Sequence, residues 1–155
     1  MLITCILAII AVAVDQYTKF LAVTNLGTES ASIPVFEGIF HLTYVKNTGA
    51  AFGIFQNGNA VLTVVMALIL AGIVGVYIAV KPRHITAKIA AGLVMGGAVG
   101  NLIDRLTRGF VVDFFDVRFI NYPVFNVADS CVVVGAVLIC IYMLFFDKKI
   151  KENEV

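Results

Sequence analysis

Residues 96–129 read GGAVGNLIDRLTRGFVVDFFDVRFINYPVFNVAD. This stretch begins inside one long apolar segment, crosses a short connection and enters a second apolar segment. Its ionisable and amide side chains include Asn101, Asp104, Arg105, Asp113, Asp116, Asn126 and Asp129. Ionisable groups beside long apolar runs are costly to keep, and by default they mark a functional site. We therefore expect the chemistry of this protein to lie here.

The composition places the chain among membrane proteins. Of its 155 residues, 61% are hydrophobic and 14% are charged, whereas soluble domains carry about 25% charged residues. A soluble core of this size cannot bury so much apolar surface, and we predict an integral membrane protein with a single domain over residues 1–155. The formal net charge of +1 gives no reason to expect a nucleic-acid partner.

Four apolar segments are long enough to span a membrane, which requires a helix of about 20 residues. We predict transmembrane helices over about 1–23, 60–80, 85–105 and 127–146, and thus an all-α membrane protein. The segment of about 24–59 is too polar to span. Within it, residues 39–45 alternate, with Phe40, Leu42 and Tyr44 on one face and His41 and Thr43 on the other. This alternation predicts a small extracytoplasmic β-sheet or flap.

Basic residues predict the orientation of the chain. If it starts in the cytoplasm, the loop after residue 80 and the C-terminal tail both face inward, with Lys81, Arg83, Lys88, Lys148, Lys149 and Lys151. Both termini are then cytoplasmic. The same topology brings most of the polar groups of the helices to one depth, near the extracytoplasmic face.

Spacing within the helices predicts two further contacts. Asp15 and Lys19 stand four residues apart, in the order that favours an ion pair on one helix face, and this pair could brace the fold or position the site. Gly92, Gly96 and Gly100 recur every four residues, which lets helix backbones approach closely in lipid. Gly100 could also leave room for a substrate backbone beside Asn101.

The grouped aspartates predict acid–base hydrolysis. Two neighbouring carboxylates cannot both ionise easily, so one keeps a proton while the other draws a proton from water. This chemistry needs neither a metal ion nor a cofactor, and the sequence holds no zinc-ligand spacing and no G-x-S-x-G motif. Asp129 begins the last span and is the best placed member. Its partner could be Asp104, Asp113 or Asp116, although the apolar surroundings of Asp113 favour it.

Five motifs now carry a resemblance to a known family. They are DQYTK at 15–19, NTGAAFG at 47–53, GGAVGNLIDR at 96–105, VVDF at 111–114 and FNVAD at 125–129. In this order, and over nearly the whole chain, they resemble the lipoprotein signal peptidases (signal peptidase II, prolipoprotein signal peptidase). That family consists of aspartic membrane proteases with four helices in the bacterial cytoplasmic (inner) membrane.

The resemblance implies both a reaction and its residues. The substrate is a prolipoprotein whose cysteine carries diacylglycerol, and the signal peptide is cleaved off just before that cysteine. Asp113 and Asp129 become the catalytic pair. Support for the peptide and the pair is implied for Asn47, Gly49, Gly97, Asn101, Arg105 and Asn126, and a structural role for Asp15, Lys19 and Asp104. We expect the enzyme to work as a monomer among membrane lipids.

Two other functions remain open from the residues alone. A small transporter or proton channel could relay ions through Asp15, Lys19, Asp104 and Asp129, but the inner halves of the spans offer almost no polar residues to continue such a path. A structural subunit could pack through its glycine face, but that function leaves the aspartates unexplained.

Overall fold

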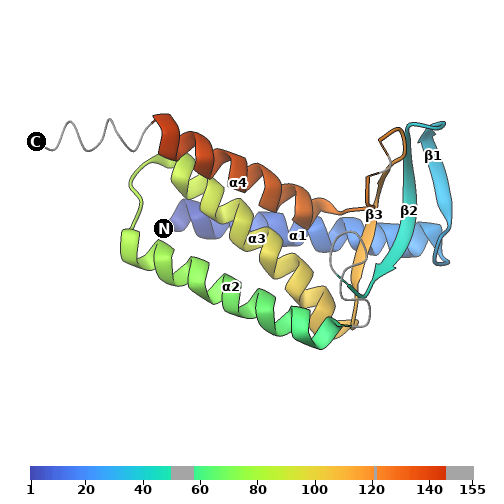
Figure 1. Ribbon diagram of the computed structural model, residues 1–155, viewed down its shortest axis with the longest axis horizontal. Helices are drawn as coiled ribbons and strands as arrows, with labels where there is room; N and C mark the ends of the chain where they lie inside the picture. Colours follow the sequence, from blue (N-terminus) through green and yellow to red (C-terminus); the bar gives the residue numbers. More distant parts are fainter. Residues whose placement is uncertain (50–57, 121, 146–155) are drawn as a thin grey trace, which may run out of the picture.

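A computed structural model describes residues 1–49, 58–120 and 122–145 of the chain. In these residues it has the helices α1 (Leu2–Leu26), α2 (Asn59–Val80), α3 (Ile85–Thr107) and α4 (Val127–Phe145). The strands are β1 (Ser32–Phe36), β2 (Phe40–Asn47) and β3 (Val111–Val117). The helices form a bundle, and the sheet stands across one of its ends (Figure 1).

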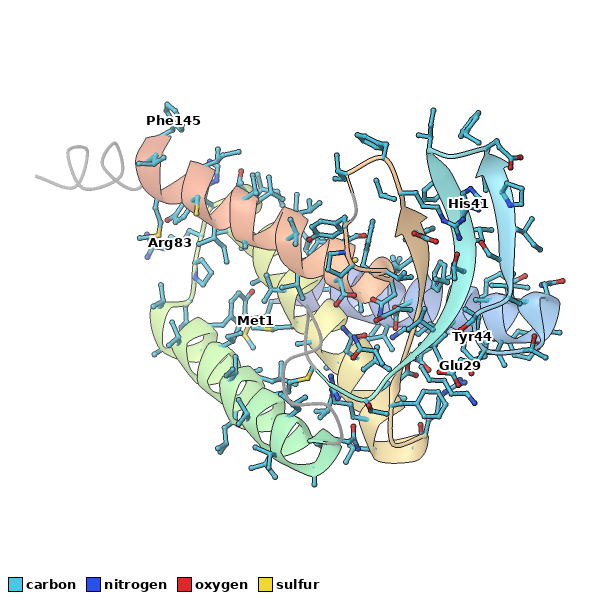
Figure 2. All side chains as sticks on the ribbon, turned by 45° about the vertical axis from the view of Figure 1, so that its right-hand side comes forward. Met1, Glu29, His41, Tyr44, Arg83 and Phe145 are labelled. Carbon is cyan, nitrogen blue, oxygen red and sulfur yellow. The ribbon has the colours of Figure 1, made fainter. Side chains whose placement is uncertain are left out.

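All four helices are long and apolar enough to cross a membrane, as the sequence predicted. The protein is therefore a membrane protein with a small sheet at one end of its helices. Arg83 and Phe145 lie at the opposite end of the bundle, whereas Glu29, His41 and Tyr44 lie at the sheet (Figure 2). The predicted flap extends into residues 50–57, and the NTGAAFG motif into 50–53, both of which lie outside the described residues, as does residue 146 at the predicted end of the last span.

Helix α3 is the centre of the bundle, because it packs against each of the other three helices. Half of the residues in the most apolar stretch of α3 are buried. Helix α2 has no charged residue and no buried residue, and it faces outward. The glycines of α3 explain this close packing. A Cβ atom at Gly96 would lie 2.8 Å from the carbonyl oxygen of Ala8 and 2.7 Å from the Cβ of Ala11. The sequence prediction of small residues at a helix contact is thus correct for Gly96.

The three strands form one antiparallel sheet in the order β1-β2-β3. The alternation predicted for 39–45 holds only in part. The register between β2 and β3 shifts between Leu42 and Val45, and Thr43 and Tyr44 are consequently both buried. Strand β3 was not predicted, because its run of mostly buried residues lacks the period of two that marks a half-exposed strand.

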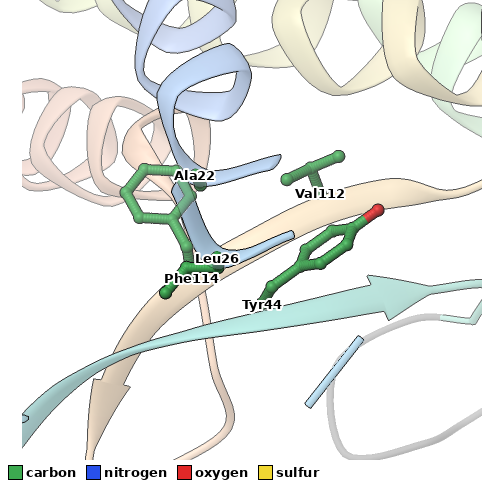
Figure 3. Close-up of a cluster of buried hydrophobic side chains, with 5 residues drawn as sticks. All are labelled: Ala22, Leu26, Tyr44, Val112 and Phe114. Atoms are coloured by element: carbon green, nitrogen blue, oxygen red, sulfur yellow. The ribbon is translucent and has the colours of Figure 1, made fainter. Parts of the chain in front are cut away.

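A small apolar cluster attaches the sheet to the bundle. Ala22 and Leu26 from the last turns of α1 pack with Tyr44 of β2 and with Val112 and Phe114 of β3 (Figure 3). This contact explains why α1 continues to Leu26 rather than ending near residue 23. The extra turn buries apolar surface at the sheet, which favours helix over loop there.

We expect Gly96→Ala to destabilise the protein and Gly72→Ala, its matched control, to leave stability unchanged or slightly higher. The added methyl at 96 meets the backbone of α1, and such overpacking costs about 1–3 kcal/mol. Around Gly72, also within a helix, a Cβ would meet nothing within 4 Å. Thermal unfolding in one detergent, with both variants side by side, measures this. Equal melting temperatures for both variants would contradict the packing described for α1 and α3.

Candidate active site

Polar side chains gather where the sheet meets the helices. Seven of them are at most 8% exposed, and they come from α1, α3, β3 and the residue before α4: Asp15, Lys19, Asn101, Asp104, Arg105, Asp113 and Asn126. Burying this many charges and amides is costly unless each one is paired. Their partners therefore define the site.

The Lys19 ammonium group uses all three of its protons inside the protein. It lies 2.8 Å from Asp15 Oδ2 and 3.1 Å from Asp104 Oδ2, with all three side chains fully buried. It also donates to Asn101 Oδ1 at 2.8 Å. The ion pair predicted from the spacing of Asp15 and Lys19 is present, and α3 supplies a second carboxylate to it.

Asp15 also holds the beginning of α4. Its Oδ1 accepts a hydrogen bond of 2.9 Å from the Ala128 N–H, one of the helix N-terminal donors that lack an intrahelical partner. A Cβ at Gly100 would lie 2.5 Å from Asp15 Oδ2. The room at Gly100 is thus taken by this carboxylate, not left for a substrate backbone.

Asp129 is held in place by the same helix N-terminus. The Asn126 side-chain Oδ1 accepts from the Asp129 N–H at 2.9 Å, and Asp129 Oδ2 accepts from the Asn126 N–H at 3.1 Å. This reciprocal pair has the geometry of a capping box, with the acid three residues after the cap. The first turn of α4 therefore fixes both the backbone and the carboxylate of Asp129.

Asp113 reaches the site from the middle of β3, between the buried side chains of Val112 and Phe114. Its Oδ1 accepts from Asn126 Nδ2 at 2.7 Å and its Oδ2 from Asn47 Nδ2 at 2.8 Å. Burial, and after it the charge of Asp129, raises the pKa of Asp113 to about 7. The hydrogen bonds from the two amides act in the opposite direction. Asp113 can therefore hold a proton near neutral pH.

Asn126 thus contacts both carboxylates, and Asn101 supports it. A lysine ammonium can only donate, so the oxygen of Asn101 must face Lys19. The same oxygen accepts from Asn126 Nδ2 at 3.0 Å, and the Asn101 Nδ2 is left to donate to Asp129 Oδ1 at 2.8 Å. The buried charge of Lys19 therefore orients an amide that binds Asp129.

Arg105 closes another side of the site. It donates to the carbonyl oxygen of Gly49 at 2.6 Å and to Asn59 Oδ1 at 3.1 Å. The N–H of Gly49 in turn donates to Asn47 Oδ1 at 3.0 Å. The buried Nε of Arg105 has no hydrogen-bond partner within the described ranges, and the charges of Asp113 and Asp129 both act on this guanidinium group.

The other two candidate partners of Asp129, Asp104 and Asp116, form ion pairs and hydrogen bonds with other residues. Asp104 binds Lys19 and Arg108, and its Oδ2 accepts from the Val112 N–H at 3.0 Å. Asp116 accepts from Thr43 at 2.6 Å and from Arg118 at 2.8 Å. Burial opposes ionisation of Asp116, but these two donors outweigh it and lower its pKa. Of the three partners considered for Asp129, only Asp113 shares Asn126 with it.

Gly97 lies at a helix contact. A Cβ there would collide with the carbonyl oxygen of Ala128, so this glycine brings the start of α4 close to α3. It therefore supports the site by packing.

Two further polar residues of the site, Gln16 and Asn59, were not predicted from the sequence. Gln16 donates to Asp15, to the Gly100 carbonyl and to Asp104, and Asn59 holds the guanidinium group and the carbonyl of Arg105. Asn59 was detectable as the polar residue at the start of an otherwise apolar span. Gln16 had a weaker signal, its place between Asp15 and Lys19 in the first helix.

The assembled group suits acid–base chemistry at a peptide bond. It offers two carboxylates that share Asn126, one of them with its pKa raised to about 7, together with amide and guanidinium donors. In the part of the chain that the structure describes, no three His, Cys, Asp or Glu side chains are grouped so as to hold a metal ion.

Comparisons with known proteins show the family to which the chain belongs. The family described as signal peptidase (SPase) II matches residues 7–145. A lipoprotein signal peptidase of Clostridioides difficile is 46% identical over 145 residues, covering 93% of this chain and 96% of that protein. One of Symbiobacterium thermophilum is 46% identical over 150 residues, covering 96% and 98%.

The fold is similar to that of solved structures. A solved structure described as a bacterial membrane enzyme has a TM-score of 0.84 at 32% identity, covering 91% of this chain and 87% of that one. A second has a TM-score of 0.82 at 32% identity, covering 92% and 93%. With the family match extending from α1 to the end of α4, this membrane protein belongs to the signal peptidase II family and is a protease.

Proposed function

We propose that this chain is a lipoprotein signal peptidase whose catalytic pair is Asp113 and Asp129. Its substrate is a prolipoprotein with a diacylglyceryl-modified cysteine, and it cleaves the peptide bond just before that cysteine. The observation that carries the assignment of the pair is the shared Asn126, which donates to Asp113 through its side chain and to Asp129 through its backbone.

The two acids divide the work. Asp113, which holds a proton near neutral pH, donates it to the oxygen of the scissile carbonyl as Asp129 takes a proton from a water molecule. The water oxygen bonds to the carbonyl carbon and forms a tetrahedral diol. The proton on Asp129 then passes to the leaving nitrogen as the carbon–nitrogen bond breaks, and Asp113 recovers a proton from the diol.

The neighbouring donors position the peptide. The Arg105 Nε, without a partner among the described residues, is available to a substrate carbonyl oxygen. Asn47 and Gly49 lie between this guanidinium group and Asp113, since Asn47 contacts both Gly49 and Asp113. The peptide can therefore be held at one side by Arg105 while its scissile bond meets the pair.

We place the site near the extracytoplasmic face of the bacterial cytoplasmic membrane. The loop with Lys81 and Arg83, followed by Lys88 in the first turn of α3, lies at the end of the bundle opposite the sheet (Figure 1), and such basic segments favour the cytoplasm. Both termini are then cytoplasmic. The enzyme acts as a monomer in this proposal.

A proton channel is the second candidate, since charged groups occur within α1 and α3. The observation against it is that the polar residues do not continue from the site to the end of the bundle away from the sheet. Helix α2 carries no charge, and the polar residues of the site occur together at the sheet end. A proton-flux measurement in liposomes tests this candidate, and we expect no flux above that of empty liposomes.

Replacing either acid should abolish peptidase activity while the fold persists. We expect Asp113→Asn and Asp129→Asn each to lower kcat for a diacylglyceryl-modified prolipoprotein peptide about a hundredfold or more, because each removes one proton-transfer group. Asp116→Asn, in the same strand as Asp113 but bound to Thr43 and Arg118, is the matched control and should keep most of its activity. Activity in either of the first two variants comparable to the parent would refute the proposed pair.

The pH dependence follows from the raised pKa of Asp113. Below about 7 this acid holds the proton that it donates, and above about 7 it loses the proton, so kcat/KM should fall as the pH rises through this value. The hydrogen bond from Asn47 favours the ionised form. Asn47→Ala should therefore raise the pKa of Asp113 further and move the alkaline limb upward by about one pH unit.

A pH–rate profile of the parent and the variant measures this shift. Asp116→Asn, which removes a carboxylate outside the site, should leave the alkaline limb where it is in the parent. A limb that moves to lower pH in Asn47→Ala, or that does not move, would show that Asp113 is not the proton donor.

A further inference from the structure

An apolar groove lies beside Asp129, between the first turns of α4 and the connection from β3 to α4. Its volume is about 410 Å³. Ile120 and Phe125 line it from the connection, and Asp129, Ser130, Val133 and Val134 line it from α4. The groove thus begins at a proposed catalytic carboxylate and continues along a membrane-spanning helix.

Most of the lining is apolar, and the polar side chains in it are those of Asp129, Ser130 and Tyr122. The Ser130 hydroxyl donates to the Asn126 carbonyl oxygen at 3.0 Å and is used within the helix. Phe125 packs against the ring of Phe115 and, edge to face, against that of Tyr122, which builds a firm aromatic wall. A ligand in this groove must be apolar, and it must have a polar or reacting end at Asp129.

We propose that this groove binds the beginning of one acyl chain of the diacylglyceryl group while the scissile bond lies at Asp129. This inference rests on the proposed function, which puts the lipidated cysteine immediately after the cleaved bond. The acyl chain is attached to that cysteine through glycerol and therefore starts close to the reacting carbonyl. The groove is the apolar space that such a chain meets first.

The groove is open to the side from which an acyl chain would come. Val133 and Val134 are 59% and 50% exposed on a helix that is apolar enough to span the membrane. Their exposed surface faces lipid, so the chain can enter sideways and keep its apolar surroundings throughout. Entry of an acyl chain by this route costs no transfer into water.

The volume of the groove argues against the signal peptide as its occupant. The signal peptide is helical where it crosses hydrocarbon, because its backbone groups must pair with one another there. A helix is at least 10 Å wide and rises 5.4 Å per turn, so a single turn fills about 420 Å³. The whole groove, at about 410 Å³, is no larger than one such turn, so it cannot enclose a spanning helix of several turns, whereas the beginning of one extended chain fits it.

The first test fills the groove. Val134→Trp places a large ring at its wall, and Val137→Trp is the matched control, with a valine of similar exposure (53%) on the same helix but outside the groove. With a substrate carrying two palmitoyl chains, we expect Val134→Trp to lower kcat/KM about tenfold or more, mainly through KM. With two acetyl groups instead, which are too short to reach position 134, the variant and the parent should differ little.

The outcomes separate this proposal from the proposed function. If the parent and both tryptophan variants cleave the long-chain substrate equally well, the enzyme assignment stands and the groove assignment is overturned. The same holds if the defect of Val134→Trp is as large with acetyl groups as with palmitoyl chains. If the parent cleaves no lipidated substrate, the proposed function itself fails.

A second test uses cross-linking to the unaltered protein, so that it does not depend on whether the tryptophan variants fold. A non-hydrolysable analogue of the lipidated peptide would carry a diazirine near the start of an acyl chain, and after illumination mass spectrometry should find the label on Ile120, Val133 or Val134. Label confined to α2 would overturn the proposal. So would label in the groove from a diazirine on the signal peptide, or from a bilayer phospholipid that the peptide does not displace.

Discussion

The buried positive charge of Lys19 is the constraint on which the rest of the site depends. An ammonium group with no exposure is tolerated only if its charge is balanced and its three protons are bound. Asp15, Asp104 and Asn101 meet both conditions from two helices. Removing any one of them leaves a charge or a donor without a partner in an apolar bundle, and these contacts therefore hold α1 against α3.

The carboxylates that bind Lys19 also bind α4 and β3, the two elements that carry the proposed catalytic acids. Asp15 binds the N-terminus of α4 through Ala128, and Asp104 binds the backbone of β3 through Val112. Asn101, oriented by Lys19, contacts Asp129 directly. One ion cluster thus positions a helix and a strand that belong to different parts of the chain, and each contributes one acid.

The surroundings of the two acids differ because they stand on different kinds of element. Asp129 lies in the first turn of a helix, where the Asn126 N–H and the Asn101 side-chain amide both donate to its carboxylate. Asp113 lies in a buried strand between apolar side chains, where the neutral form is favoured. In the proposed reaction Asp113 gives a proton while Asp129 takes one, and the groove beside Asp129 adds an apolar approach from the membrane.

The sequence by itself determined the four spans, because about 20 apolar residues cross hydrocarbon as a helix whatever their neighbours are. It also determined the pairing of Asp15 with Lys19, a contact within one helix turn, and the family through its ordered motifs. It did not predict β3 or the extra turn of α1, which depend on contacts with Val112, Phe114 and Tyr44 from other elements. Residue chemistry alone left Asp104, Asp113 and Asp116 open as partners for Asp129, and only the tertiary structure shows that the side-chain amide of Asn126 contacts one of the three, Asp113. Hydrogen bonds between distant segments depend on how those segments pack, and local sequence does not encode that packing.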